Sequence, residues 1–295
     1  MAGSIPLVRA VERALRILDC FDEEHPVLGP AEAARRVGLP KSTAYRLMLT
    51  LAAHGYLERV GEERFELGRR LLYLGLQVRA GGELREAAHP VMVALRDRFR
   101  ESVHLHIREG HERVCIHSVE GTHDLRVAGS VGRRAPLYAG ASARAILAFL
   151  PPAEVEAVLA AGLSPLTPAT ITDPDRLRAE LERVRRQGYA VSAGERIEGT
   201  ASIAVPLWRP SGEVVGSLAV SGPRFRFDPE GVPGLVPALF EAAAAIYRRL
   251  GGRGRPPGQP PAHPALADGG GRPQWVSPGG PVGSQAALPE PRSVS

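Results

Sequence analysis

The sequence has few of the features that mark secreted, membrane or disulfide-bonded proteins. Its 295 residues include two cysteines. No ligand spacing links Cys20 and Cys115, so we expect both to be reduced, buried and apolar in character. A run of about 18 apolar residues is lacking, which argues against a membrane span. No basic-then-apolar leader is present, because the segment from Val8 is already amphipathic. We therefore expect a cytoplasmic protein of roughly two domains.

Lysine is almost absent, so arginine carries nearly all of the positive charge. Lys41 is the only lysine in a chain with 37 basic and 32 acidic side chains. The net charge of +5 does not by itself indicate a nucleic-acid partner, since residues 1–68 hold nine basic and ten acidic side chains. Between Ala33 and Leu57, however, there is no acid, and the basic residues are Arg35, Arg36, Lys41 and Arg46. Such a patch can offset phosphate charge, although similar solvated faces occur in proteins that bind nothing.

Residues 30–57 have the pattern of two short helices that are separated at Gly38, with the second opening at Pro40. Proline suits a first helical turn, because its missing N–H would be unpaired there. The second helix has an apolar stripe, which contains Ala44, Leu47 and Leu51, and an opposite face with Ser42, Thr43, Tyr45 and Arg46. Hydroxyl groups bind phosphates, and arginine pairs with guanine in the major groove. This favours a helix-turn-helix, with a helical hairpin in some other core as the alternative.

The flanking segments predict a winged form of this motif. Apolar spacing from Val8 to Leu18 predicts a first helix of about fourteen residues. Residues 56–67 have the pattern of two short strands around a tight turn. Two arginines of this hairpin could lie along the phosphate backbone, although acidic residues at its tip oppose that contact. The candidate DNA contacts are Arg35, Lys41, Ser42, Thr43, Tyr45, Arg46, Arg59 and Arg64.

Beyond the hairpin, residues 69–79 predict a connecting helix that Gly81 and Gly82 separate from a further amphipathic helix. The connecting helix has more apolar surface than a small domain covers, which indicates either a second subunit or an ordinary interdomain helix. We expect four parts: a winged helix-turn-helix domain at 1–68, a linker helix at 69–82, a second domain at 83–250, and a disordered tail at 251–295, where 20 of 45 residues are Pro or Gly.

The second domain predicts an α+β fold with one antiparallel sheet, open to a pocket on one face. Alternating residues predict strands at 102–108, 113–119, 125–131, 201–208 and 214–221. Helices are expected after Leu137, from Asp173 to Gln187, and from about Pro229 to Leu250. Asp173 and the proline after it form a helix start signal.

Two segments of this domain could bind a small anion. Small residues from Leu137 to Ser142 leave main-chain N–H groups free at a helix entry. Between Gly188 and Val205, polar side chains stand near strand entries, namely Ser192, Glu195 and Ser202. The alternative is structural: the small residues allow close packing of a helix on the sheet, and the polar residues cap turns.

From Val8 to about Leu250 the chain resembles the IclR family of transcriptional regulators. The resemblance is carried by residues 31–51, by residues 130–150, and by a signature order of Gly188, Ser192, Glu195, Ser202, Ile203, Ala204 and Leu207. The chain departs from the family at Trp208 and Arg209, where a smaller aromatic or His and then Asp, Asn or Gly are usual. Arg144 stands where the family often has lysine.

The resemblance implies a GAF-like domain that binds a small effector, often an organic acid, in dimers or tetramers on double-stranded operator DNA. It implies neither a cofactor nor catalysis. Carried over by position, the effector pocket would involve Leu137, Ala141, Ser142, Ser192, Glu195, Ser202 and Ser221. Ala141 stands where the family often has Gly, and Ala219 stands where it can have Ser. These replacements would make the pocket less polar, which favours an effector with an apolar or aromatic part.

Histidines supply the main rival interpretation. His104 and His106 share one face of a predicted strand, and His117 lies on the next strand. Three imidazoles could hold zinc, as a binding site or in a metal-dependent enzyme acting on a small acid. Such an enzyme lacks a convincing general base or nucleophile, and paired strand histidines are more often buried hydrogen-bonding groups. A DNA-binding architectural protein without any ligand is a third possibility.

Overall fold

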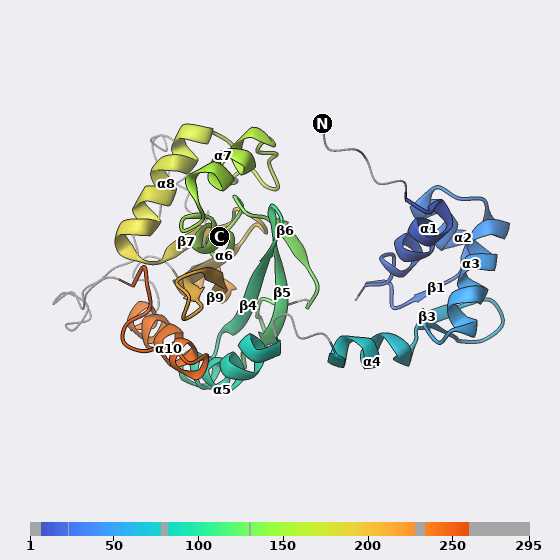
Figure 1. Ribbon diagram of the computed structural model, residues 1–295, viewed down its shortest axis with the longest axis horizontal. Coiled ribbons are helices and arrows are strands. Elements are labelled where there is room, and N and C mark those ends of the chain that lie inside the picture. Colours follow the sequence, from blue (N-terminus) through green and yellow to red (C-terminus); the bar gives the residue numbers. More distant parts are fainter. Residues whose placement is uncertain (1–6, 23, 78–81, 130, 228–233, 260–295) are drawn as a thin grey trace, which may run out of the picture. The chain divides into compact units, whose positions relative to one another are not determined.

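The computed structural model describes residues 7–22, 24–77, 82–129, 131–227 and 234–259 (Figure 1). The chain divides into two compact units, Met1–Glu83 and Leu84–Ser295. Each unit is considered by itself. Among the described residues, no helix combines the length and the hydropathy that crossing a membrane requires.

The first unit is a winged helix-turn-helix, as the sequence predicts. Its helices are α1 (Arg9–Leu18), α2 (Pro30–Val37), α3 (Lys41–Ala53) and α4 (Arg69–Gln77). Its strands are β1 (Val27–Leu28), β2 (Leu57–Arg59) and β3 (Phe65–Leu67), which form an antiparallel sheet in the order β1-β3-β2. The strands β2 and β3 with the turn between them are the wing.

Local signals set the break between α2 and α3. Gly38 ends α2 with a φ of 69°, a left-handed conformation that glycine adopts without strain. Pro40 is the N-cap of α3 rather than its first residue. The buried face of α3 is formed by Ala44 and Met48, both 0% exposed, whereas Leu47 is only partly buried. The core stripe is therefore rotated by about one residue from the predicted one.

The first helix differs more from the prediction. It has 10 residues instead of about fourteen, and its buried residue is Ile17. Most of the predicted apolar stripe faces away from the core of this unit, because Val8, Val11 and Leu15 are each more than half exposed, whereas Leu18 packs against the core.

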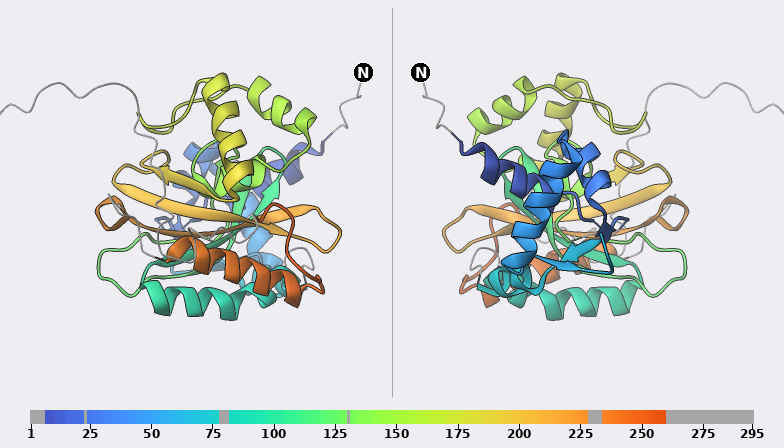
Figure 2. Two further views of the ribbon diagram at one scale, coloured as in Figure 1. Left: turned by 90° about the vertical axis from the view of Figure 1, so that its left-hand side faces the viewer. Right: turned by 90° about the vertical axis from the view of Figure 1, so that its right-hand side faces the viewer.

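The second unit contains a six-stranded antiparallel sheet in the order β6-β5-β4-β9-β8-β7. The strands are β4 (Ser102–Glu109), β5 (Glu112–Val119), β6 (Arg134–Pro136), β7 (Ala190–Ala193), β8 (Thr200–Trp208) and β9 (Val214–Pro223). The helices are α5 (Gly82–Phe99), α6 (Ala141–Leu147), α7 (Pro152–Ala160), α8 (Pro174–Gln187), the short α9 (Arg224–Phe227) and α10 (Leu235–Arg249). Figure 2 shows α5 and α10 on one side of the sheet, with α7 and α8 on the other.

Alternation along the strands fills the cores on both faces of the sheet. On β8, Ile203 and Val205 belong to the core beneath α5 and α10. Ala204 between them belongs to the core beneath α6, together with Ala219 of β9. These small side chains let α6 lie close to the sheet, as the structural alternative for the small residues predicts. Asp173 caps α8 by accepting a hydrogen bond from the Arg176 N–H at 2.7 Å, also as predicted.

The strand predicted at 125–131 is wrong over its described part. Residues 125–129 form no strand, and residue 130 lies outside the described residues. This segment passes over the end of β4 and β5 instead of pairing with the sheet edge. A Cβ on Gly129 would lie 2.4 Å from His104 Nδ1 and 2.1 Å from Ser118 Oγ, so the backbone here approaches both side chains closely. The edge strand is β6, which pairs with β5.

The C-terminal expectations lie partly outside the described residues. Of the helix predicted from Pro229, residues 229–233 are not described, and α10 begins at Leu235. Of the predicted disordered tail, residues 260–295 lie outside the described part. Residues 251–259 include the buried Gly252 and Pro256, and Gly258 lies close to the Trp208 side chain.

Candidate functional site

The exposed face of α3 contains most of the predicted DNA contacts. Lys41, Ser42 and Arg46 are exposed, while Thr43 and Tyr45 are half-buried. The Tyr45 ring packs edge-on against Phe65 of the wing, with 6.5 Å between ring centroids, so this side chain also belongs to the edge of the core. The α3 face is thus held rigidly while its hydroxyl and cationic groups stay accessible.

The other predicted contacts lie on α2 and the wing. Arg35 is exposed on α2. In the wing, Arg64 donates to the Val27 carbonyl at 2.8 Å, and Arg59 donates to the Glu62 carbonyl at 2.5 Å. Arg64 therefore ties the hairpin to β1, whereas the Arg59 bond closes the turn of the hairpin itself. The acidic hairpin tip also reaches α3, since Glu63 Oε2 lies 3.5 Å from Lys41 Nζ, with both side chains more than half exposed.

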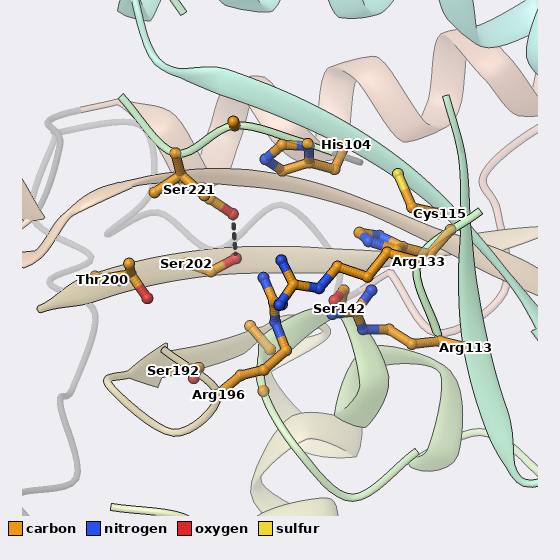
Figure 3. Close-up of a pocket in the computed structure, with 17 residues that line it drawn as sticks. His104, Arg113, Cys115, Arg133, Ser142, Ser192, Arg196, Thr200, Ser202 and Ser221 are labelled. Carbon is orange, nitrogen blue, oxygen red and sulfur yellow. Dashed lines mark hydrogen bonds between the residues drawn. The ribbon is translucent and has the colours of Figure 1, made fainter. Parts of the chain in front are cut away.

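The second unit has a cavity on the α6 face of the sheet (Figure 3). It lies between β4, β5, β8 and β9, the N-terminal end of α6, and the segments around residues 127–133 and 192–200. Its lining consists of His104, His106, Arg113, Cys115, Val127, Ala128, Gly129, Arg133, Gly140, Ala141, Ser142, Ser192, Arg196, Thr200, Ala201, Ser202 and Ser221. The sheet therefore opens to a pocket on one face, as predicted.

Five of the seven predicted effector residues meet in this cavity, namely Ala141, Ser142, Ser192, Ser202 and Ser221. Ser202 and Ser221 are direct partners on β8 and β9, and the Ser221 hydroxyl donates to the Ser202 oxygen at 3.0 Å. The hydroxyl groups therefore form a polar side of the cavity.

Leu137 and Glu195 are not part of the lining. Leu137 is fully buried in the core beneath α6. The Glu195 carboxylate instead pairs with Arg144, with 2.8 Å between Oε1 and Nη2, and it accepts a long hydrogen bond of 3.4 Å from the Gly140 N–H. The entry of α6, which the sequence suggested for a bound anion, therefore already faces the protein's own carboxylate.

Arg144 is held by several partners at once. It is 1% exposed, donates to the Val191 carbonyl at 2.6 Å, and has Glu180 Oε1 at 3.7 Å from its Nε. Burial lowers the pKa of its guanidinium, but Glu195 more than offsets this effect, and the pKa is raised above its ordinary value. The network links α6 and α8 to β7, which carries Ser192, and to the segment after β7, which carries Arg196.

The cavity is also lined by three arginines that the sequence analysis did not identify. Arg113 extends from β5, Arg133 precedes β6, and Arg196 follows β7. Figure 3 shows their guanidinium groups directed toward the same space, beside Ser142. Nothing in the local sequence distinguishes them from the other arginines, because they come from three separate segments. The described lining residues include no Asp or Glu and no Phe, Tyr or Trp.

The geometry contradicts the proposed histidine site for zinc. His104 and His106 do share a face and line the cavity. A bulge in β5 places Cys115 opposite His106 and His117 opposite Leu105, so His117 faces α5 on the other side of the sheet. There its Nε2 lies 2.8 Å from His89 Nδ1. Within the described part of the chain, no three His, Cys, Asp or Glu side chains are placed to hold a metal ion.

The two cavity histidines are neutral. Burial, with a smaller contribution from Arg113, lowers the pKa of His104 to about 3. Burial also lowers the pKa of His106 well below its ordinary value, and Arg113 adds to the effect. Neutral imidazoles can donate or accept hydrogen bonds toward a ligand, but they add no charge to the cavity.

Comparison with known proteins agrees with this architecture. The family described as "IclR helix-turn-helix domain" matches residues 10–61, and "Bacterial transcriptional regulator IclR C-terminal" matches residues 77–248. The chain is 34% identical to the HTH-type transcriptional regulator KipR of Bacillus subtilis, over 82% of this chain and 97% of KipR. It is 33% identical to the regulator XynR of Escherichia coli, over 84% and 99%.

Solved structures show the same relationship. The IclR of Thermotoga maritima has a TM-score of 0.67 at 32% identity, covering 82% of this chain and 99% of that one. An IclR homolog from Microbacterium hydrocarbonoxydans, complexed with 4-hydroxybenzoate, has a TM-score of 0.74 at 30% identity, covering 82% and 98%. These relatives are regulators rather than enzymes, in line with the sequence prediction. The chain belongs to the IclR family of DNA-binding transcriptional regulators.

Proposed function

We propose that α3 reads a double-stranded operator in the cytoplasm through Lys41, Ser42, Thr43, Tyr45 and Arg46. The exposure of the cationic and hydroxyl groups on this helix supports the assignment. Three further arginines, Arg35, Arg59 and Arg64, would contact the phosphate backbone beside it. Phosphate contacts would place the unit on the duplex, while the arginine of α3 would read a base edge.

The cavity of the second unit would bind a small organic acid that modulates operator binding. One observation carries this proposal: hydroxyl and guanidinium groups converge on a cavity whose described lining has no carboxylate. The bound 4-hydroxybenzoate of the Microbacterium homolog, itself an organic acid, supports it. The acid can act on the operator only if its affinity differs between two arrangements of the regulator.

A homo-oligomer, a dimer or tetramer, would bring two α3 helices to the half-sites of one operator. Exposed apolar side chains support this part of the proposal. Val11 and Leu15 on α1 are 56% and 55% exposed, and Leu72 and Tyr73 on α4 are 61% and 55% exposed. Contiguous apolar faces of this kind mark contact surfaces in soluble proteins.

Operator reading is tested with Arg46→Ala. The cognate duplex is first selected from random sequences with the wild-type protein, and affinities are then measured by fluorescence anisotropy at fixed salt. If Arg46 pairs with a base edge, the variant loses about 1–3 kcal/mol on the cognate duplex and much less on random DNA. Arg16→Ala, which removes an exposed arginine of α1, is the control. Equal losses on both duplexes would show that Arg46 contacts only phosphate.

The effector site is tested by a thermal-shift screen of small organic acids, followed by anisotropy with each acid that stabilises the protein. An effector raises the melting temperature and changes operator affinity. Ser142→Trp fills the cavity and should remove both responses, whereas Ser211→Trp, in an exposed turn, should keep them. Unchanged responses in the Ser142 variant would place the site elsewhere. Operator binding that no acid alters would favour a purely architectural second domain.

A further inference from the structure

The three cavity arginines form a concentration of like charge without a counter-charge in the described lining. Two other arginines of this unit are treated differently. Arg144 is enclosed by Glu195 and Glu180, and Arg226 is paired with the buried Glu101. Within the described part of the chain, no carboxylate forms an ion pair with the cavity arginines. The protein therefore neutralises its structural arginines and leaves those of the cavity charged.

Arg113 is the most buried of the three, at 4% exposure. Burial, together with repulsion from Arg196 and Arg133, lowers the pKa of its guanidinium to about 9. The pKa of Arg196 is lowered by burial and by Arg133 in the same way. Arg113 and Arg196 thus carry their charges at a cost that an anion in the cavity would remove, whereas the Arg133 side chain is exposed.

Buried hydrogen-bonding atoms in the cavity also lack partners. Arg113 Nε, His104 Nε2 and His106 Nδ1 are all buried without a hydrogen bond. Buried polar atoms are normally satisfied, so these unpaired atoms in a cavity lining are groups that a bound ligand can engage. Because both histidines are neutral, the ligand's charge must be matched by the arginines alone.

We propose that the effector carries two anionic groups on one short molecule. This inference rests on the proposed effector function and specifies its ligand class. A single carboxylate would match only one of the two desolvated charges, those of Arg113 and Arg196, whereas a dianion matches both. Guanidinium forks bind carboxylate and phosphate oxygens in pairs, so short dicarboxylates and phosphorylated monocarboxylates are the two sources of this chemistry. The hydroxyl side, with Ser202 and Ser221, receives the polar or apolar middle of the molecule.

The test compares acids that differ by one anionic group, using the full chain at low ionic strength. Calorimetric titration is carried out with malonate against propionate, succinate against butyrate, glutarate against pentanoate, and 3-phosphoglycerate against glycerate. At least one dianion should bind about tenfold or more tightly than its monoanionic partner, because hydrogen bonds between charged groups are the strong ones. Comparing the three dicarboxylates with 3-phosphoglycerate then shows whether the second anionic group is a carboxylate or a phosphate.

Variants then assign the preference to the cavity. Arg133→Gln and Arg196→Gln should each weaken dianion binding by about tenfold or more and bring it close to that of the monoanion. Both side chains are less buried than Arg113, so these variants should fold. Each should also melt at a higher temperature than wild type without ligand, since one repulsive charge is gone. Arg134→Gln is the matched control, because Arg134 is exposed, pairs with Glu109 and Glu112, and is not in the lining.

Two results would overturn the proposal. If monoanions bind as tightly as dianions and the glutamine variants keep that affinity, the effector has one anionic group, and the organic-acid function itself still stands. If neither class binds the folded wild-type protein, both the dianion and the effector function fail. Operator affinity measured on the same preparation is independent of both results and separates them from a failure of DNA binding.

Discussion

Glu195→Gln should destabilise the second unit more than any substitution in the cavity lining. The Glu195 carboxylate is 8% exposed and faces an Arg144 guanidinium that is 1% exposed. Glutamine has nearly the same shape but carries no charge. Arg144 would then keep the Val191 carbonyl and the more distant Glu180, which is also engaged by Arg183 at 2.6 Å.

The magnitude follows from the burial of this pair. Two unit charges about 4 Å apart interact by about 4 kcal/mol at an effective dielectric constant of roughly 20. Removing one partner of a buried pair costs about 3–5 kcal/mol, because the other charge stays buried. Glu180 compensates in part, so we expect a loss of about 3 kcal/mol. Replacing both residues, Arg144→Met with Glu195→Leu, should cost clearly less than the single change, since no unmatched charge remains.

Urea unfolding monitored by circular dichroism measures the free energy of unfolding for wild type, for Glu195→Gln, for the single variants Arg144→Met and Glu195→Leu, and for their double variant. The matched control is Glu156→Gln, which removes an exposed carboxylate paired with Arg178 on the surface and should cost far less, because solvent screens the pair. A loss below about 1 kcal/mol for Glu195→Gln, or a double variant as unstable as the two singles combined, would refute the reasoning.

Two further predictions follow from the cavity. His104 has a folded-state pKa of about 3, so between pH 6.5 and 3 the unfolded chain binds a proton that the folded chain does not. Stability should therefore fall as the pH decreases below about 6.5, by about 1.4 kcal/mol per pH unit once the unfolded histidine is protonated. Urea titrations at several pH values should show that His104→Gln flattens this slope. An unchanged slope would contradict the prediction. Gly129→Ala places a Cβ 2.4 Å from His104 Nδ1 and should lower stability by about 1–3 kcal/mol and weaken acid binding. Gly75→Ala, where nothing lies within 4 Å, should instead stabilise its helix by about 0.5–1 kcal/mol, and equal melting temperatures for the two variants would refute the close approach.

Much of the fold could be predicted from sequence because its signals are local. Gly38 and Pro40 mark the break between α2 and α3, and Asp173 with its following proline marks the start of α8. Alternating residues identify β4, β5, β8 and β9. The same approach failed at residues 125–129, where an alternating pattern accompanies a segment that covers the cavity. An alternating pattern indicates which side chains point to opposite sides of the backbone, but it does not indicate whether the backbone pairs with a neighbouring strand.

Only part of the candidate site could be predicted from the sequence. The cavity serines lie in family-like motifs, and their positions in the chain are enough to suggest them. Glu195 has the same kind of signal but is turned toward Arg144. The bulge in β5 places His117 on the opposite face of the sheet from His104 and His106, and no sequence pattern predicts this bulge.

The sequence by itself determined the break between α2 and α3, the start of α8, the alternation along β4, β5, β8 and β9, and the combination of a winged helix-turn-helix with an α+β domain. These properties depend on neighbours within a few positions. Only the tertiary structure decided that Arg113, Arg133 and Arg196 meet in one cavity, and that Glu195 neutralises Arg144 instead of meeting a ligand. Charges from segments that are distant along the chain interact only after the sheet has brought them together.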